Sequence, residues 1–303
     1  MPEGDTIVWT ARRLDASLSG KVLTRTDFRV PSLATTDLAG RESLPVATYG
    51  KHLFHRLSGG VTIHSHLKME GRWSTLVAPH AAPPREAKRL ETQVRRAERG
   101  HTTRALLYVS DALAVASKLG LLDVIPTSEE QAIIGRLGPD IMAESWPETG
   151  LDAALDNLRG QPQRLLGEAL LDQRNLAGLG TFWISEMLFV HGVLPWLTVA
   201  EVPEETLRAV LDDARRLMLA SATTGVQSST GRAGDGETKR VHARSGLPCV
   251  RCTDTVRVAM IGEAGRERTL FSCPTCQGGY APNDDRRPQR PLVERPAGGR
   301  RRV

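Results

Sequence analysis

The stretch CVRCTDTVRVAMIGEAGRERTLFSCPTCQ, residues 249–277, does most to decide the fold. It contains all four cysteines of the chain, in two Cys-x2-Cys pairs separated by 20 residues: Cys249, Cys252, Cys273 and Cys276. Two such pairs supply the four thiolates of a tetrahedral structural zinc site, which leaves no position for water. The alternatives are four unrelated thiols or two disulfides, and disulfides do not suit the reducing compartment expected for a chain without a secretion signal. The pattern predicts one zinc ion that folds a small module and performs no chemistry.

The residues around the cysteines outline that module. Residues 256–260 and 268–272 have the texture of two β-hairpin strands around a glycine-containing turn. They lie inside a predicted zinc finger at 240–280, preceded by a predicted linker at 228–239 that is rich in Ser, Gly and Thr. Residues 281–303 are rich in proline and arginine and poor in apolar side chains, so they are predicted to be a disordered basic tail.

The positive charge is concentrated at the same end. Residues 1–230 carry 25 Lys/Arg and 27 Asp/Glu, whereas residues 231–303 carry 15 and 8, a net charge of +7. A basic end suggests an anionic polymer such as nucleic acid, although a merely solvated tail is the alternative. No apolar window is long enough to span a membrane, and the first residues lack the regions of a secretory signal. We expect a soluble, unexported protein.

The rest of the chain shows two kinds of apolar pattern. Apolar residues recur at helical spacing from Glu3 to Leu18, and short β-branched runs follow, which predicts a helix and a β-rich domain over residues 1–127. Helical periodicity dominates a second predicted domain, residues 149–227.

Two segments interrupt this pattern. Residues 78–101 combine prolines with a run of charged side chains, so we predict a mobile loop or exposed insertion. Residues 128–148 are predicted to be a hinge between the two domains.

The first residues offer a nucleophile. Removal of the initiator methionine would leave Pro2 as the mature amino terminus, with a secondary amine. The positive end of the following helix disfavours the protonated amine, and Glu3 beside it can donate or accept a proton. The alternative is structural, because proline suits the first helical position, and Glu3 and Asp5 suit the amino-terminal end of a helix.

Residues 170–181, LLDQRNLAGLGT, predict the end of one helix, a tight turn, and a new helix that starts near Thr181. Backbone amides at such a helix start can bind phosphate, and Gly178 and Gly180 permit close approach of a nucleic-acid strand. An ordinary packing corner between two helices is equally open.

Together, the Pro-Glu-Gly start, the LLDQRNLAGLG turn and the cysteine pairs resemble the formamidopyrimidine/endonuclease VIII family of DNA glycosylases, most closely the actinobacterial endonuclease VIII type. The resemblance covers residues 1–277. It implies an α+β fold with an amino-terminal helix plus β-sandwich domain, a helix-two-turns-helix domain and a C-terminal β-hairpin zinc finger. It also implies a monomer that acts on damaged double-stranded DNA in the bacterial cytoplasm and is associated with the nucleoid.

The resemblance also implies three catalytic residues. Pro2 attacks C1′ of the damaged nucleotide and Glu3 handles protons. Lys51 falls on the family's β-hairpin lysine, which contacts phosphate near the lesion, and a solvated surface lysine is the alternative.

Further positions are expected to bind DNA. Gly178, Gly180 and Thr181 form the turn that holds phosphate, and Arg268, five residues before the third cysteine, is the family's zinc-finger arginine. Met69 resembles the residue that fills the gap in the base stack, with a core methionine as the alternative.

Two positions depart from the family pattern. Thr6 stands where the family has a second glutamate, and Thr181 stands where the turn usually supplies an asparagine. Thr181 can still cap the helix and donate to phosphate, whereas Thr6 leaves the catalytic efficiency and the lesion range open. The favoured function is a glycosylase/AP lyase for oxidised bases, chiefly pyrimidines. The alternatives are the sister activity on oxidised purines and a damaged-DNA-binding protein with an impaired active site.

Overall fold

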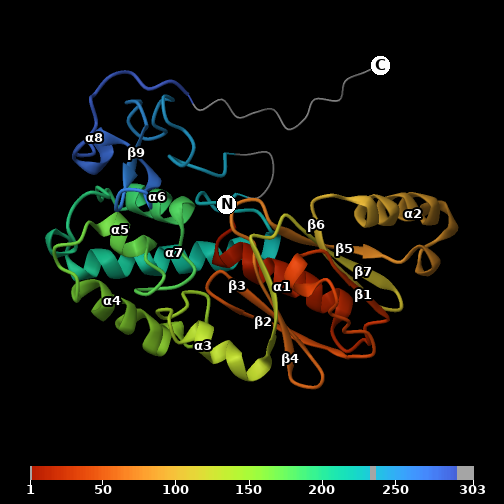
Figure 1. Cartoon of the computed structure of the whole chain (residues 1–303). Coiled ribbons are helices and arrows are strands. Elements are labelled where there is room, and N and C mark those ends of the chain that lie inside the picture. Colours follow the sequence, from red (N-terminus) through yellow and green to blue (C-terminus); the bar gives the residue numbers. More distant parts are fainter. Residues whose placement is uncertain (1, 233–236, 292–303) are drawn as a thin grey trace, which may run out of the picture. The chain divides into compact units, whose positions relative to one another are not determined.

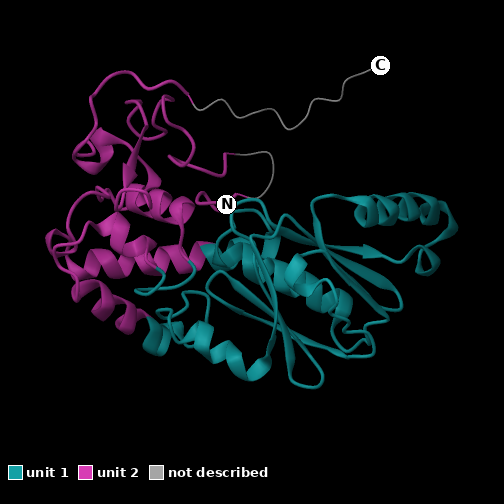
Figure 2. Ribbon diagram, in the orientation of Figure 1, with its two compact units in different colours: residues 1–150, 173–178, 218–227 teal, residues 151–172, 179–217, 228–303 magenta. Residues whose placement is uncertain are grey.

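The computed structural model describes residues 2–232 and 237–291 and divides into two compact units (Figure 2). Unit 1 comprises residues 1–150, 173–178 and 218–227, and unit 2 comprises 151–172, 179–217 and 228–303. Short stretches of the helical region therefore pack with the amino-terminal unit. The consecutive domain boundaries drawn from the sequence stay predictions.

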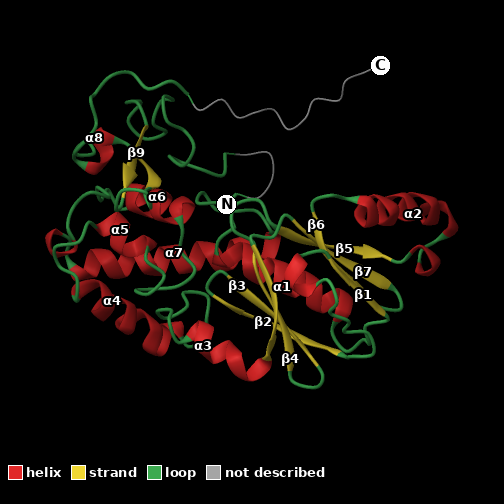
Figure 3. Cartoon of the chain, viewed as in Figure 1, coloured by secondary structure: helices red, strands yellow, loops and turns green. Residues whose placement is uncertain are grey.

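Unit 1 is built from helix α1 (Gly4–Leu18) and two antiparallel four-stranded sheets (Figures 1 and 3). The first sheet has the order β2 (Ser43–Tyr49), β3 (His52–Leu57), β4 (Val61–His66), β8 (Leu121–Pro126). The second has the order β1 (Arg25–Phe28), β6 (Thr103–Tyr108), β7 (Ala112–Ser117), β5 (Arg72–Val77). One apolar cluster joins α1 to both sheets, with Ile7, Leu53 and Leu107 fully buried in it. This confirms the predicted helix and β-sandwich.

Of the two alternatives predicted for residues 78–101, a mobile loop or an exposed insertion, the loop was wrong. The segment contains a four-turn helix, α2 (Pro84–Arg99), which starts with proline at its first position. Leu90 is buried, and Val94 and Ala97 pack on a second apolar cluster of the sheet. These three residues form a narrow apolar stripe among many charged ones, so the composition concealed the helix.

The predicted hinge also contains folded structure. Helix α3 (Glu130–Ile134) lies within it, and a π-helical turn (Trp146–Gly150) begins within it and ends two residues beyond it. The Glu130 carboxylate is buried, accepts a 2.6 Å hydrogen bond from Thr62 and pairs with Arg56 on β3.

Unit 2 contains helices and the cysteine hairpin. The helices are α4 (Leu151–Arg159), α5 (Leu166–Leu171), α6 (Thr181–Val190), α7 (Glu204–Thr224, whose last turns belong to unit 1) and α8 (Pro274–Gln277). Strands β9 (Arg257–Ile261) and β10 (Arg268–Ser272) pair in the predicted hairpin. Helix α6 is buried from Thr181 to Phe189, and its Ser185 hydroxyl accepts the Phe271 N–H at 3.1 Å, which attaches β10 to the helix.

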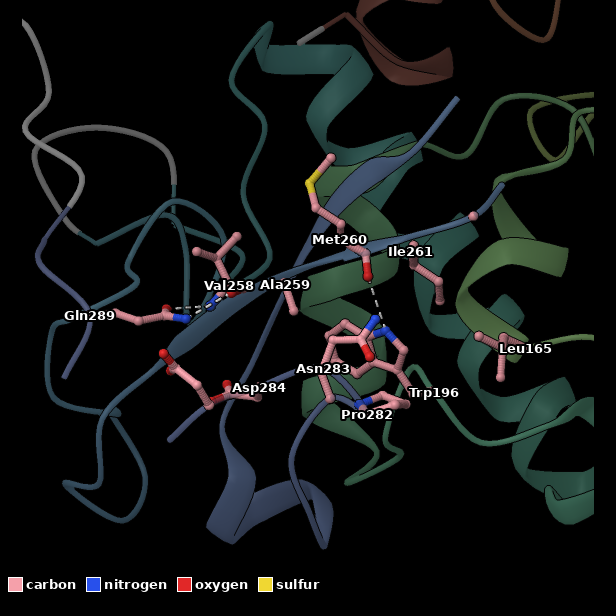
Figure 4. A pocket seen from close by; sticks show the side chains of 13 residues that line it. Leu165, Trp196, Val258, Ala259, Met260, Ile261, Pro282, Asn283, Asp284 and Gln289 are labelled. Carbon is pink, nitrogen blue, oxygen red and sulfur yellow. Dashed lines mark hydrogen bonds between the residues drawn. The ribbon is translucent and has the colours of Figure 1, made fainter. Parts of the chain in front are cut away.

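Part of the predicted disordered tail is ordered. Residues 281–291 lie along the outer edge of β9, where the Gln289 amide pairs with both the N–H and the carbonyl of Val258 at 2.8 and 2.9 Å (Figure 4). Arg257 and Asp284 form an ion pair whose side chains are 8% and 1% exposed. Val258, Asp284 and Gln289 also border a cavity of about 490 Å³ beside Trp196. Composition cannot show such pairings; residues 292–303 of the predicted tail lie outside the described residues.

Within the described part of the chain, no helix is both long and apolar enough to cross a membrane.

Candidate active site and nucleic-acid interface

The amino-terminal segment is packed into unit 1. Glu3 is fully buried and is the N-cap of α1, and Pro2 just before it is half-buried. The structural alternative required proline at the first helical position, but Pro2 lies before the N-cap instead. The buried Glu3 side chain therefore lies at the start of α1.

Two glycines dock this segment on the turn at residues 173–178. The Gly4 N–H donates to the Gly178 carbonyl at 2.9 Å. A Cβ at Gly4 would lie 3.1 Å from Met142 Cγ and 3.3 Å from Gly178 Cα, so a larger residue would push the segments apart. Gly178 itself has φ +108°, in the region that favours glycine, and a Cβ there would lie 2.9 Å from Ile141 Cγ2. The Pro-Glu-Gly start and the LAGLG turn thus fit each other.

The turn between β2 and β3 docks on the same place. Gly50 has φ +56°, and a Cβ there would lie only 2.8 Å from Ala177 Cβ. The Tyr49 hydroxyl donates to the Gly138 carbonyl at 2.9 Å and fixes the turn from its other side. Lys51 follows directly and is half-buried. Glu3 and Lys51 are therefore each one residue from a glycine that contacts the 177–178 backbone.

Met69 lies at an exposed tip between β4 and β5. Its side chain is 59% exposed, so the core alternative was wrong. The His66 ring accepts the Lys68 N–H at 2.9 Å, which holds Lys68 at φ +54°. Lys118, on the neighbouring loop, pairs with Glu70 at 2.6 Å. Sequence reasoning missed both supports, and only the His-x-His run before the tip hinted at the first.

The histidines behind this tip are neutral at physiological pH. Burial lowers the pKa of His52 to about 4 and that of His66 to about 3. His52 Nδ1 lies 2.9 Å from His64 Nε2, and burial also lowers the pKa of His64. A neutral His66 ring can accept the Lys68 N–H, so the tip geometry depends on the uncharged form.

In unit 2, α6 begins at Thr181 as predicted, but Thr181 does not cap it. Gly180 is the N-cap, with no side-chain cap, and Thr181 is the first helical residue and 4% exposed. The helix start thus presents backbone rather than a capping hydroxyl.

Sequence reasoning also missed Glu186 on α6. Its fully buried carboxylate accepts the backbone N–H groups of Arg240, Val241 and His242 at 2.8, 2.8 and 2.6 Å, and the Ser229 hydroxyl. It ties α6 to the chain that enters the cysteine module. The available signal was one charge in the apolar helix TFWISEMLFV.

The four cysteine sulfurs form one cluster. They all lie within 4.8 Å of one another, with Cys249–Cys276 at 3.8 Å and Cys252–Cys273 at 3.4 Å. Tetrahedral Zn–S bonds of about 2.3 Å place sulfurs roughly 3.8 Å apart, so the cluster fits the ion. Burial raises the pKa of Cys276 to about 11 and that of Cys273 further, while the Asp254 backbone lowers that of Cys252. Four thiolates at neutral pH would therefore require a cation.

Arg268 is exposed at the start of β10, just after the hairpin turn. This is a suitable place to reach a phosphate, and the role stays a prediction.

Comparison with known proteins identifies the family. The family model of the formamidopyrimidine-DNA glycosylase N-terminal domain matches residues 1–109. The chain is 45% identical over 282 residues to probable endonuclease 8 2 of Streptomyces coelicolor, covering 93% of this chain and 96% of that protein. The chain belongs to the formamidopyrimidine-DNA glycosylase and endonuclease 8 family. This confirms the resemblance.

Other members of the family agree. The DNA-(apurinic or apyrimidinic site) lyase Nei2 of Mycolicibacterium smegmatis is 38% identical over 280 residues, covering 91% of this chain and 99% of that protein. The structure of MutM (Fpg) from Thermus thermophilus is similar with a TM-score of 0.67 at 26% identity, covering 92% and 100% of the two chains. Lactococcus lactis Fpg in complex with DNA containing an abasic site shares the fold, with a TM-score of 0.71 at 20% identity over 91% and 99% of the chains.

Proposed function

We propose that this protein is a bifunctional DNA glycosylase and AP lyase of base-excision repair, which removes oxidised bases, pyrimidines favoured, from double-stranded DNA. The observation that carries the proposal is the docking of residues 2–4 and 49–51 on the 177–178 turn. This docking brings the buried Glu3, at the start of α1, near the turn that carries Lys51. The chain is also 45% identical to a probable endonuclease 8.

The proposed reaction starts after removal of Met1. The secondary amine of Pro2 attacks C1′ of a nucleotide turned out of the stack, where the sugar is accessible. The C1′–N bond breaks, and the base leaves with its electron pair and takes up a proton. Opening of the sugar ring leaves an iminium between Pro2 and C1′, and the proton released by the amine balances the one gained by O4′. Glu3 is the proposed proton carrier.

The iminium then leads to strand cleavage. It acidifies the C2′ protons, and loss of one forms a C2′=C3′ double bond as the 3′ phosphate leaves. A second elimination can expel the 5′ phosphate. Water finally hydrolyses the iminium and releases the amine of Pro2.

DNA binding is proposed to rest on phosphate contacts from Lys51, Arg268 and the 178–181 turn, which position the duplex without reading its sequence. Met69 is proposed to enter the gap in the stack, a role that its exposure at a braced tip supports. One structural zinc ion is proposed to hold the β9–β10 hairpin and with it Arg268. We propose that the protein acts as a monomer on chromosomal DNA in the bacterial cytoplasm.

Borohydride trapping tests the chemistry. The protein is incubated with duplexes that carry an abasic site, an oxidised pyrimidine or 8-oxoguanine, and the covalent complex is reduced and quantified. We expect trapping to be lost in Pro2→Gly and Glu3→Gln and kept in Glu129→Gln, a control at an exposed glutamate. Preference for 8-oxoguanine would favour the purine-directed activity, and tight binding without trapping would favour an impaired DNA-binding protein. Mass spectrometry showing Met1 still attached to active protein would refute the Pro2 mechanism.

A further inference from the structure

An open cavity of about 450 Å³ lies under helix α2 in unit 1. Its wall on the helix side includes Gln93 and Arg96, and α2 packs against strands β5 and β6. Its opposite wall includes the ends of three neighbouring strands, where Ser117 pairs with Arg72 on one side and with Thr103 on the other.

The lining of this cavity is cationic. Its charged side chains are Arg72 and Arg96; hydroxyl groups also line it, and no aspartate or glutamate of the described chain does. Across residues 2–232 and 237–291, no carboxylate forms an ion pair with Arg72 or Arg96. Other arginines of α2 differ, because Arg89 lies 4.0 Å from Glu86 and Arg95 lies 3.5 Å from Glu91.

Helix α2 adds to the positive charge around the cavity. Its sequence, PREAKRLETQVRRAER, contains six Lys/Arg and three Asp/Glu, a net charge of +3. Its third glutamate, Glu98, accepts a hydrogen bond from Tyr108 and lies 3.8 Å from Arg25, away from the cavity lining. An anion in the cavity would therefore meet two arginines with no carboxylate in the lining.

The cavity lies beside the Met69 tip. Arg72 is three residues after Met69, a distance that extended chain spans in at most about 11 Å. Ser117 immediately precedes Lys118, which pairs with Glu70 on the tip, and the Lys118 N–H donates to the Thr102 carbonyl at 2.8 Å. One DNA strand carries a charge every ~3.4 Å of helix axis, so a phosphate about three nucleotides from the Met69 step falls within reach.

The lining also indicates which part of a nucleic acid fits. It contains no phenylalanine, tyrosine or tryptophan of the described residues on which a base could stack. Arginine forks and the hydroxyl groups of Ser74 and Ser117 suit the oxygens of a phosphate diester instead.

We propose that the cavity under α2 is a second DNA contact, in which Arg72 and Arg96 bind a backbone phosphate of the duplex flanking the lesion. This inference rests on the proposed function, since it takes the Met69 tip as the part of unit 1 that enters DNA. In this proposal, helix α2 extends the surface that contacts the duplex.

The test measures how DNA affinity depends on salt. Fluorescence anisotropy with a duplex that carries a stable abasic-site analogue gives Kd between 50 and 200 mM salt for wild type and Arg72→Gln/Arg96→Gln. Loss of two phosphate contacts reduces the slope of log K against log salt by about 1.8. Wild type should then lose about twelvefold more affinity than the variant over this range. Arg72→Lys/Arg96→Lys should restore most of the slope, because the charges remain.

The matched control is Arg89→Gln/Arg95→Gln, which removes the same charge from the same helix at residues that do not line the cavity. It should keep the wild-type slope. Equal slopes for the two Gln pairs would overturn the proposal. Calorimetry with inorganic phosphate and with dAMP at fixed ionic strength tests whether the cavity binds a small free anion. If it does, and the Arg72→Gln/Arg96→Gln variant keeps the wild-type salt slope on the duplex, the proposal is also overturned.

The proposed function is decided separately, by borohydride trapping with wild-type protein on the same duplex sequence carrying an abasic site. A slope difference without trapping would preserve the phosphate site and refute the enzyme.

Discussion

Replacing Gly50 by alanine tests whether the packing of the β2–β3 turn positions Lys51. The added Cβ would lie 2.8 Å from Ala177 Cβ, where carbon atoms normally approach to about 3.5–4.0 Å. A residue other than glycine at φ +56° costs about 1–2 kcal/mol, and the overlap adds about 1–3 kcal/mol. We expect the free energy of unfolding to fall by about 2–5 kcal/mol in urea titrations. If relief of the overlap shifts Lys51 by about 1 Å, the single-turnover trapping rate should fall up to a hundredfold.

Two further variants separate the causes. Gly60 has φ +71° with open space around it, so Gly60→Ala carries the backbone cost alone and should leave trapping unchanged. In Gly50→Ala/Ala177→Gly the colliding atom is gone, and the next contacts lie at 3.4 and 3.6 Å, so trapping should recover. The reasoning is refuted if Gly50→Ala matches Gly60→Ala in both assays, or if the double variant recovers nothing.

Three other predictions concern stability. Glu186→Gln replaces one acceptor oxygen by an amide N–H2 that faces one or two backbone donors and should lower the free energy of unfolding by about 1–3 kcal/mol; an unchanged melting temperature would contradict this. Chelation should release one zinc per chain, measured by elemental analysis, and abolish duplex binding by unfolding the cysteine hairpin; full binding by metal-free protein would contradict it. His52, His55 and His66 have pKa values of about 4, 4 and 3, below the unfolded value near 6.5. The unfolded chain thus binds more protons as pH falls from 6.5 to about 4, and each histidine should remove about 1.4 kcal/mol per pH unit. Urea titrations that show no loss across this window would refute the burial argument.

The sequence predicted those elements whose apolar pattern is regular and self-contained. Helix α1, helix α6 and the β9–β10 hairpin begin within a residue or so of their predicted positions. Helix α2 was missed because its apolar pattern is short: Leu90 is buried, and Val94 and Ala97 pack on the sheet. The ordered part of the tail was missed because Gln289 and Asp284 act through contacts with β9 that are remote in the sequence.

The candidate site shows the same limit. Motifs could nominate Pro2, Glu3 and Lys51, because each stands in a recognisable local string. They could not show what holds these residues, since the supports are contacts between segments that are far apart in the sequence. Glu186 is an example, because its carboxylate accepts hydrogen bonds from three backbone amides of residues 240–242, a segment that carries no motif of its own.

The two glycines of the LAGLG turn therefore have different reasons to be glycine. The sequence analysis predicted that both glycines permit the close approach of a DNA strand. The space beside Gly178, however, is filled by Ile141 and by Asp140, whose Oδ1 would lie 3.3 Å from an added Cβ. The Gly178 carbonyl also accepts a hydrogen bond from the Gly4 N–H. Gly180 has φ −142°, extended backbone that any residue adopts, so its conformation sets no demand for glycine. A change at Gly178 must then act through the position of the amino-terminal segment, whereas Gly180 directly precedes α6, the helix start to which the proposed function assigns phosphate binding.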